Sequence, residues 1–221
     1  MTFRVDGGGY LPSGNQQVFV VPAHGGTPRQ MTSGDFPISS AVTWSPDSQS
    51  VIFSSNRRDD AEYHPRQSDL FGAALLTGQI TQITDTAGPE GRPVVSPNGR
   101  YLAYTQTADI RQGYNGAKLT IRDLRTSESR SLTTDFDRSV SDIQWSQDSK
   151  SLWISYTDLG MVRVAKIDLR GKLRQSDIVV GGTAIGRPYT SGSFSVGGKG
   201  VCVCVCVLVL GWWVGLWCMW G

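Results

Sequence analysis

The segment Trp44-Ser45-Pro46-Asp47-Ser48-Gln49-Ser50-Val51-Ile52-Phe53 decides the fold, because it recurs along the chain. Residues 95–104 (VSPNGRYLAY) repeat it 51 residues later, and residues 145–154 (WSQDSKSLWI) repeat it after another 50. Residues 194–200 (FSVGGKG) have the shape of a fourth copy. Because a period of about 20–50 residues is typical of solenoids and propellers, the chain is expected to be a repeat protein.

Each copy of this segment predicts a β-hairpin. Pro46 and Pro97 preset the φ angle that the first central position of a type I turn requires, and Asn98 can hydrogen-bond its own backbone. Gly99 can adopt the positive φ of the bulge that closes such a hairpin, a role for which Ser149 is less suited. The sequence therefore predicts two short antiparallel strands, a and b, in every repeat.

The apolar run after each turn is expected to form a strand covered on both faces by its neighbours. Such continuous runs occur at 51–53 (VIF), 102–104 (LAY) and 152–154 (LWI). Trp44 and Trp145 are expected to pack between neighbouring units, and Val95 is the weaker substitute in the middle repeat.

A second pattern lies between the hairpins. An apolar strand ends near Asp-Leu, a turn follows, and another strand closes at Leu-Thr or Ile-Thr. One period therefore holds four strands: a (Val42–Trp44), b (Val51–Ser54), c (Asp69–Leu76) and d (Ile80–Thr84). We predict an all-β chain that forms a partial β-propeller of four-stranded antiparallel blades, with about three blades plus partial blades at each end.

Composition divides the chain into parts. Residues 1–15 are rich in glycine and are expected to be irregular, residues 16–200 form the incomplete β-propeller, and residues 201–221 are a low-complexity apolar tail. All four cysteines lie in the tail, so the body has no disulfide, thiol nucleophile or cysteine-ligated metal. The net charge of +2 is dispersed, which gives no electrostatic case for nucleic acid or an anionic membrane surface.

The tail reads VCVCVCVLVLGWWVGLWCMWG and carries no charge. Every residue in it except Met219 can be encoded by codons made only of G and T, so we interpret it as a frameshift or a translated G/T-rich repeat. A membrane anchor is the alternative, because the tail exceeds the threshold of about 18 apolar residues. No apolar signal segment follows Met1, so the cytoplasm is the default location if the chain is complete.

The sequence contains no recognisable catalytic machinery. It has no Gly-x-Ser-x-Gly nucleophile elbow, and its two histidines, His24 and His64, are expected to be solvated loop residues. Asp135 and Asp137 could contribute to a cation site, although loop aspartates more often form turns. We therefore predict no catalytic residue, no cofactor and no metal in this chain.

Alternating strand direction separates two kinds of loop. The a–b and c–d turns share one face of a propeller, and the b–c and d–a connections share the other. The first two b–c loops, Ser55–Gln67 and Thr105–Ala117, are long, and long loops on a rigid scaffold commonly carry binding. The candidates for contact with a substrate or a docked domain are Arg57, Arg58, Glu62, Tyr63, Arg111 and Tyr114. The alternative is a solvated, self-paired loop in which Arg57, Arg58 and Arg66 offset Asp59, Asp60 and Glu62.

The repeat and its linking segments resemble the N-terminal β-propeller of prolyl-oligopeptidase-type serine peptidases, with the acylaminoacyl-peptidase and dipeptidyl-peptidase-like branch the most similar. The resemblance rests on the W-S-P-D-x-x-x-V-I-F repeat and on residues 19–32 (FVVPAHGGTPRQMT), and it is supported by residues 56–58 (NRR), 111–114 (RQGY) and 186–194 (GRPYTSGSF). It covers about residues 3–200. TolB-like propellers carry the bare repeat as well.

The resemblance implies a propeller that gates substrate access to an α/β-hydrolase domain, so that only short peptides reach a Ser-Asp-His triad. That hydrolase domain is not found in this sequence, so we expect a chain that is inactive alone. The partners implied are the hydrolase domain of the parent enzyme and, in the parent, a peptide substrate. The alternatives are a non-enzymatic TolB-like binding propeller and a tail-anchored envelope protein.

Overall fold

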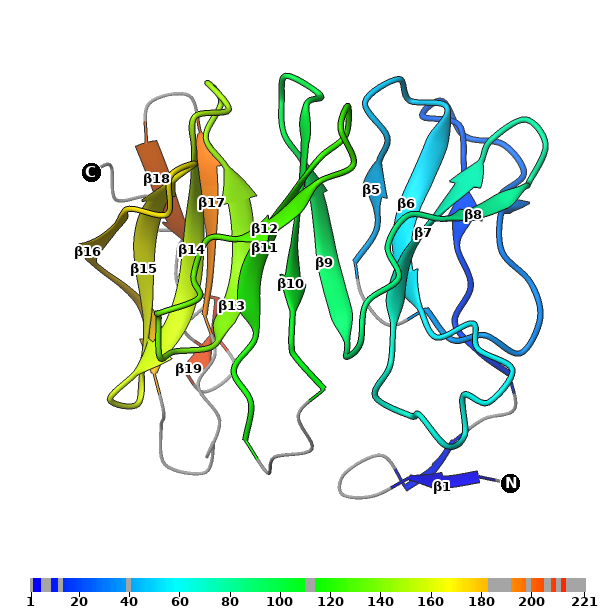
Figure 1. Cartoon of the computed structure of the whole chain (residues 1–221), viewed down its shortest axis with the longest axis horizontal. Coiled ribbons are helices and arrows are strands. Elements are labelled where there is room, and N and C mark those ends of the chain that lie inside the picture. Colours follow the sequence, from blue (N-terminus) through cyan, green and yellow to red (C-terminus); the bar gives the residue numbers. More distant parts are fainter. Residues whose placement is uncertain are drawn as a thin grey trace.

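The computed structural model describes residues 2–4, 9–11, 14–38, 41–109, 114–182, 192–197, 200–204, 208–209 and 212–213. Side chains are described over 14–38, 41–109, 114–182 and 192–197. Within these ranges every regular element is a β-strand (Figure 1). The predicted all-β class is confirmed.

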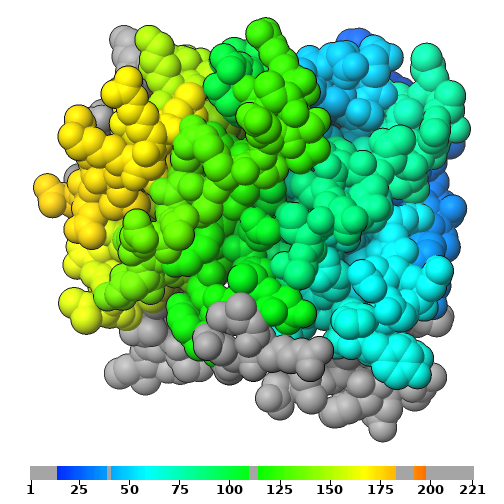
Figure 2. Space-filling model, in the orientation of Figure 1, coloured from blue at the N-terminus to red at the C-terminus, as the bar shows by residue number. Residues whose placement is uncertain are grey.

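Three four-stranded antiparallel sheets form the body of the molecule, and each is a blade whose strands pair in chain order. Blade 1 contains β5 (Thr43–Trp44), β6 (Ser50–Ser55), β7 (Asp69–Ala74) and β8 (Ile80–Gln82). Blade 2 contains β9 (Glu90–Val95), β10 (Tyr101–Gln106), β11 (Lys118–Asp123) and β12 (Ser129–Ser131). Blade 3 contains β13 (Val140–Trp145), β14 (Ser151–Asp158), β15 (Met161–Asp168) and β16 (Leu173–Gly182). The blades stand side by side in chain order (Figures 1 and 2).

A half-blade lies at each end of this row. The first half-blade is the c–d pair of β3 (Phe19–Val20) and β4 (Arg29–Gln30). The last half-blade is the a–b pair of β17 (Ser193–Gly197) and β18 (Gly200–Cys204). The described residues therefore form three blades with a partial blade at each end, as the sequence predicted.

The a–b turns have the predicted geometry, and all three are built in the same way. In blade 1 the Ser45 hydroxyl donates to Asp47 Oδ1 at 2.6 Å, which also accepts the Gln49 N–H at 3.0 Å. The residues in the bulge position have φ angles of 56° at Ser48, 68° at Gly99 and 58° at Ser149. A serine therefore adopts the left-handed conformation at two of the three turns.

The Leu-Thr or Ile-Thr ending of strand d also has a structural reason. The buried hydroxyls of Thr32, Thr84 and Thr133 accept the backbone N–H of the facing strand c residue at 2.8–2.9 Å. Those donors belong to Val18, Leu70 and Leu119. Because buried N–H groups need partners, the threonine completes the c–d ladder where the backbone of strand d turns away.

The apolar cores lie between blades. Strand b supplies both sides: Leu102 and Tyr104 pack toward blade 1, whereas Ala103 packs toward blade 3. Leu102, Ala103 and Tyr104 are all fully buried, and the corresponding residues of blades 1 and 3 are buried except for the partly exposed Trp153. The expectation of a strand covered on both faces is confirmed.

Trp145 packs between blades as predicted, but the expectation for Trp44 is wrong. Trp145 is buried, donates its indole N–H to the Val94 carbonyl at 3.0 Å and stacks on Tyr101 at a centroid distance of 6.2 Å. Trp44 is 48% exposed. The unit that precedes it in the described residues is a c–d pair, so the a and b strands that would cover Trp44 are missing there.

The two terminal segments differ from the expectations in their backbone. The segment expected to be irregular contains a short hairpin of β1 (Thr2–Arg4) and β2 (Gly9–Leu11). At the other end, β18 extends from Gly200 into the apolar tail and pairs with β17, with Val196 opposite Val201. β19 (Leu208–Val209) and β20 (Trp212–Trp213) form a further pair, and the rest of the tail lies outside the described residues. No helix long and apolar enough to cross a membrane occurs among the described residues.

Candidate binding site

The long loops gather at one end of the blades, opposite the a–b turns (Figure 1). The b–c connection of blade 1 spans residues 56–68 and that of blade 2 spans residues 107–117. In blade 3 the same connection is a two-residue turn at Leu159 and Gly160, with φ angles of 48° and 75°. The long-loop face is therefore built by blades 1 and 2.

The blade 1 loop is ordered by its own hydrogen bonds. Its backbone forms successive turns, in which the Tyr63 N–H donates to the Asp60 carbonyl at 3.0 Å and the Gln67 N–H donates to the His64 carbonyl at 3.0 Å. The buried Asn56 side chain donates to the same His64 carbonyl at 2.8 Å. These hydrogen bonds fix the conformation of the loop, which forms one wall of the cleft described below.

Gln67 and Gly88 fasten this wall to blade 2. The Gln67 amide oxygen accepts the Gly88 N–H at 2.7 Å, and its amide nitrogen donates to the Thr86 carbonyl at 2.6 Å. Gly88 has a φ of +100°, and a Cβ there would lie 2.0 Å from the Thr107 carbonyl oxygen. Only glycine fits this close approach. At Gly88, the connection between blades 1 and 2 therefore packs directly against the start of the blade 2 loop.

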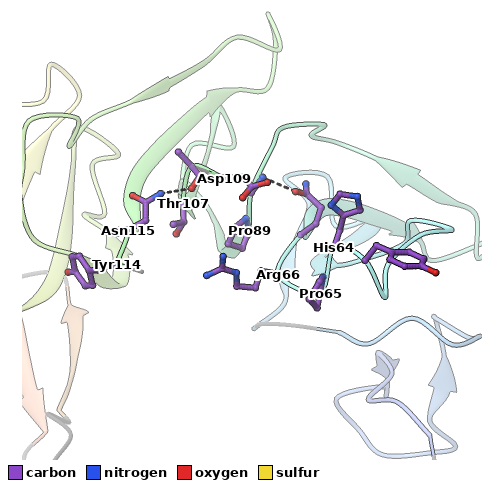
Figure 3. Close-up of a pocket in the computed structure, with 12 residues that line it drawn as sticks. His64, Pro65, Arg66, Pro89, Thr107, Asp109, Tyr114 and Asn115 are labelled. Atoms are coloured by element: carbon purple, nitrogen blue, oxygen red, sulfur yellow. Dashed lines mark hydrogen bonds between the residues drawn. The ribbon is translucent and has the colours of Figure 1, made fainter. Parts of the chain in front are cut away.

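An open cleft of about 600 Å³ lies between the two loops. It is lined by residues from both b–c loops and from the connection between the blades: Tyr63, His64, Pro65, Arg66, Gln67, Gly88, Pro89, Thr107, Ala108, Asp109, Tyr114 and Asn115. Figure 3 shows Arg66 extending from the first loop into the space that separates Pro65 from Tyr114. On the far wall, the Asn115 side chain donates to the Ala108 carbonyl and holds the second loop closed.

The cleft offers charge of both signs and aromatic surface. Arg66 and Asp109 both line it, and neither forms an ion pair within the described part of the chain. Tyr63 is 79% exposed and Tyr114 is 71% exposed. Large exposed aromatic rings on opposite walls can stack on an apolar or planar group, while the two free charges can each pair with an opposite charge.

The candidate residues from the sequence divide between this cleft and a second hollow. Tyr63 and Tyr114 line the cleft. Arg57 and Arg58 line a separate hollow of about 520 Å³, together with Asp69 and Asp85. Glu62 is exposed and lines neither, and Arg111 lies outside the described residues.

The alternative for the first loop was that its charged side chains pair with one another. Some of them do. Arg58 binds Asp60 with its Nε at 2.8 Å and its Nη2 at 3.3 Å, and His64 Nε2 lies 3.4 Å from the same carboxylate. Arg57 instead stacks over Phe36, with 4.3 Å between its guanidinium carbon and the ring centroid. Arg66 remains directed into the cleft.

Three carboxyl groups near this face have shifted pKa values. The hydrogen bond from Arg58 lowers the pKa of Asp60. Burial raises the pKa of Asp69, and the nearby Asp85 adds to that rise. Burial also raises the pKa of Glu90, against the hydrogen bonds that Thr84 and Thr86 donate to it.

Metal-binding chemistry has no support among the described residues, which contain no group of three or more His, Cys, Asp or Glu side chains placed to hold an ion. Asp137 pairs with Arg138, and Phe136 between the two aspartates packs edge-on against Tyr156 at 5.0 Å. His24 is exposed in its loop.

Arg66, Asp109 and Gly88 were not among the sequence candidates. Arg66 was considered only as a counter-charge within its loop, and Asp109 and Gly88 carried no motif. The signal that could have found Arg66 is its place beside Pro65 near the end of a long loop. Nothing in the sequence shows that Gly88 lies against Thr107, because that contact depends on how two blades meet.

Comparison with known proteins agrees with this architecture. Residues 10–107 match the family model of the dipeptidyl peptidase IV (DPP IV) N-terminal region. A relative from Porphyromonas gingivalis, dipeptidyl-peptidase 5, is 29% identical over 138 residues, which are 60% of this chain and 20% of that protein. Dipeptidyl-peptidase 5 of Aspergillus fumigatus is 33% identical over 86 residues, which are 38% of this chain and 12% of that protein.

The chain is therefore similar, over residues 10–107, to the N-terminal region of dipeptidyl peptidase IV and, over 138 residues, to dipeptidyl-peptidase 5. The chain spans a fifth or less of the length of these relatives. The row of blades also shares its fold with solved structures. A Mycobacterium tuberculosis puromycin-hydrolyzing peptidase superposes with a TM-score of 0.63 at 16% identity, over 86% of this chain and 32% of that one. TolB from Acinetobacter baumannii gives a TM-score of 0.62 at 18% identity, over 85% and 42%.

Proposed function

We propose that this chain is the substrate-gating propeller part of a serine peptidase that acts on short peptides, and that it binds peptide but does not cleave it. The relationship to dipeptidyl-peptidase propellers supports the peptide class. The absence of a Gly-x-Ser-x-Gly elbow from the sequence supports the lack of cleavage. In the parent enzyme, the partner of the long-loop face is an α/β-hydrolase domain.

The observation that carries the proposal is the cleft between blades 1 and 2. A short peptide has a cationic amino terminus, an anionic carboxyl terminus and side chains between them. Asp109 and Arg66 offer the matching charges, and the exposed rings of Tyr63 and Tyr114 offer apolar contact. Because Gly88 and Gln67 fix the two walls against each other, little ordering is needed when a peptide enters.

The test is binding of fluorescent tetrapeptides to the purified chain, measured by anisotropy, together with a peptidase assay. We expect Arg66→Ala to weaken binding at least about tenfold, because a hydrogen bond to a charged group contributes roughly 1.5–3 kcal/mol. Arg125→Ala is the matched control, since Arg125 is exposed in a c–d turn on the opposite face. In the peptidase assay, neither the variants nor the unaltered chain should release product.

Equal peptide affinity in Arg66→Ala, Arg125→Ala and the unaltered chain would contradict the placement of the peptide in the cleft. Peptide turnover that survives repurification would contradict the gating role.

A non-enzymatic binding propeller is the second candidate, and the similarity to TolB supports it. Such a protein would hold a folded partner on the long-loop face and would have no measurable affinity for short peptides. The anisotropy experiment therefore separates the two functions.

A further inference from the structure

A buried carboxylate lies next to the cleft. Glu90 is 2% exposed and directly follows Pro89, which lines the cleft. Within the described part of the chain, no cationic side chain forms an ion pair with this carboxylate. The titratable groups that face it there are Asp69 and Tyr104, and neither carries a positive charge. Because an unpaired charge is costly to bury, the packing of the blades alone does not explain a carboxylate at this place.

The sequence repeat offers a comparison within the chain. Glu90 lies opposite Gln106 on strand b of its blade. Ile38 and Val140 hold the corresponding places in blades 1 and 3, where they pair with strand b and pack into apolar clusters. An apolar residue is therefore sufficient at two of these three places, and the carboxylate occupies the one next to the cleft.

The Glu90 carboxylate holds two threonine hydroxyls. Thr84 donates to one of its oxygens, and Thr86 donates to the other at 2.6 Å. Both hydroxyls also act as acceptors, since Thr84 receives the Leu70 N–H at 2.9 Å and Thr86 receives the Gln106 side-chain amide at 3.0 Å. A hydroxyl has a single proton to donate, so each threonine gives its proton to Glu90.

Thr86 in turn connects the carboxylate to the base of both cleft walls. The Thr86 carbonyl accepts the side-chain amide of Gln67, which lines the cleft at the end of the blade 1 loop, at 2.6 Å. The Thr86 hydroxyl accepts the amide of Gln106, the residue directly before the blade 2 loop. One residue therefore holds an anchor of each wall, and its own hydroxyl is oriented by Glu90.

We propose that Glu90 is a positioning residue for the cleft, whose carboxylate fixes Thr86 and through it the anchors Gln67 and Gln106. The proposal rests on the proposed function, because it concerns peptide binding in the same cleft. It explains why a carboxylate stands at this junction, whereas Ile38 and Val140 stand at the corresponding places of the neighbouring blades.

The informative substitution is Glu90→Gln, which keeps the shape of the side chain. A carboxylate accepts at both oxygens, whereas a carboxamide accepts at one end and donates at the other. Thr84 is 4% exposed, so its proton has no water to turn to and keeps the remaining acceptor. Thr86 is partly exposed and is therefore the hydroxyl that is released.

The positioning role and a merely structural role predict different combinations of results. If Glu90 served only to stabilise the fold, Glu90→Gln would lower the stability and loosen the cleft together. Burial penalises the ionised carboxylate, so the positioning role predicts that Glu90→Gln melts no lower than the unaltered chain at pH 7 while its cleft walls loosen. A lower melting temperature together with looser walls would overturn the proposal.

The first measurement needs no peptide and follows amide exchange by NMR at pH 7. The probes are the Gly88 N–H, bound by the Gln67 side chain, and the Thr107 N–H, which donates to the Pro89 carbonyl at 3.0 Å. Both should exchange at least about threefold faster in Glu90→Gln. Glu128→Gln is the matched control, because it makes the same change at an exposed c–d turn on the opposite face and should leave both rates unchanged.

The second measurement is tetrapeptide affinity by fluorescence anisotropy. Glu90→Gln and Thr86→Val should each weaken binding by about three- to tenfold, as expected for one lost hydrogen bond, whereas Glu128→Gln should bind as the unaltered chain does. Because both changes break the same connection, the double variant should bind no more weakly than either single variant. Thr86→Ser keeps the hydroxyl and should retain the affinity.

Each measurement can overturn the proposal. Unchanged Gly88 and Thr107 exchange in Glu90→Gln would overturn it whether or not peptide binds, and equal affinities of Glu90→Gln and Glu128→Gln would also overturn it. Additive losses in the double variant would overturn the route through Thr86. If the unaltered chain bound no tetrapeptide, the proposed function would fail, and the exchange rates would still decide whether Glu90 positions the walls. Thr86→Val provides the same exchange test if Glu90→Gln does not fold.

Discussion

At the residue scale, the bulge position of the a–b turn shows how one backbone is reached from different side chains. Gly99 adopts its φ of 68° without a steric penalty, whereas Ser48 and Ser149 adopt 56° and 58° against the preference of an L-residue. The turn holds them there through Ser45 and Ser146, whose carbonyls accept the bulge residue's N–H at 2.9 Å in both cases. Local hydrogen bonds thus offset the strain of the left-handed conformation.

Ser48→Gly should stabilise the chain by about 0.5–1 kcal/mol. The left-handed conformation costs an L-residue about 1–2 kcal/mol, and part of the gain is lost because glycine is more flexible when unfolded. Ser48 is exposed, so its side chain packs against no core. Urea unfolding measures the change.

Ser149→Gly is the control for that substitution. Ser149 is buried, and its hydroxyl accepts the Asn98 N–H from the neighbouring blade at 3.0 Å. The relief of strain is therefore offset by the lost hydrogen bond, and a smaller gain is expected. A larger gain in Ser149→Gly than in Ser48→Gly would show that the inter-blade bond contributes nothing.

Glu90 makes the stability of the junction between blades 1 and 2 depend on pH. Its carboxylate accepts from the Thr84 and Thr86 hydroxyls, and Asp69 is the charged group that disfavours its ionisation. Burial raises its pKa above the ordinary 4.5. Because the folded state then holds this proton more tightly than the unfolded state, the contribution of Glu90 to stability is fully present below its ordinary pKa of 4.5 and is lost as pH rises through the raised pKa.

Glu90→Gln should remove that decline. The neutral amide is not penalised by burial as the carboxylate is, so the variant should become increasingly more stable than the unaltered chain as pH rises above 4.5. Melting curves of both proteins between pH 4 and 8 give the difference, in which the similar contribution of Asp69 largely cancels. A difference that is constant or shrinks with rising pH would contradict the account.

At the element scale, the threonine that ends strand d is the repeated device that completes each c–d pair. Thr133→Val removes the acceptor of the buried Leu119 N–H at nearly unchanged volume. The unpaired donor should cost about 1–3 kcal/mol in unfolding free energy. Thr133→Ser keeps the hydroxyl and should lose less, and equal losses in the two variants would show that packing of the methyl group matters instead.

The elements were largely predictable because their signals are local and repeat. The turn residues Pro46, Asn98 and Gly99 predict the hairpin before any contact is known, and the boundaries of β6 and β7 differ from the expected ones by only one or two residues. Trp44 was not predictable in the same way. It has the same sequence context as Trp145, and its exposure depends on which strands lie beside it.

The cleft was less predictable than the fold for the same reason. Loop length indicates the functional face and leads to Tyr63 and Tyr114. The pairing partners of Arg57 and Arg66 depend on side-chain directions in a loop without regular structure, and one arginine stacks on Phe36 while the other enters the cleft. Sequence reasoning has no periodic pattern to use in such a loop.

At the scale of the whole molecule, the structure separates a scaffold from a functional face. The inter-blade cores lie along strands a, b and c, and the short turns lie at one end of the blades. The long loops of blades 1 and 2 lie at the other end and form the cleft. Substitutions in the cleft are therefore expected to leave the inter-blade cores unchanged.

Peptide binding in the cleft is tested most sharply by a hydrogen–deuterium exchange footprint of a saturating tetrapeptide on the full chain. Peptide bound in the cleft should slow exchange at residues 63–67, 107–109, 114 and 115, which form its two walls. Exchange should be unchanged in the short turns at 45–49, 75–79 and 96–100 on the opposite face. Protection confined to those short turns, or no protection at either cleft wall, would contradict peptide binding in the cleft.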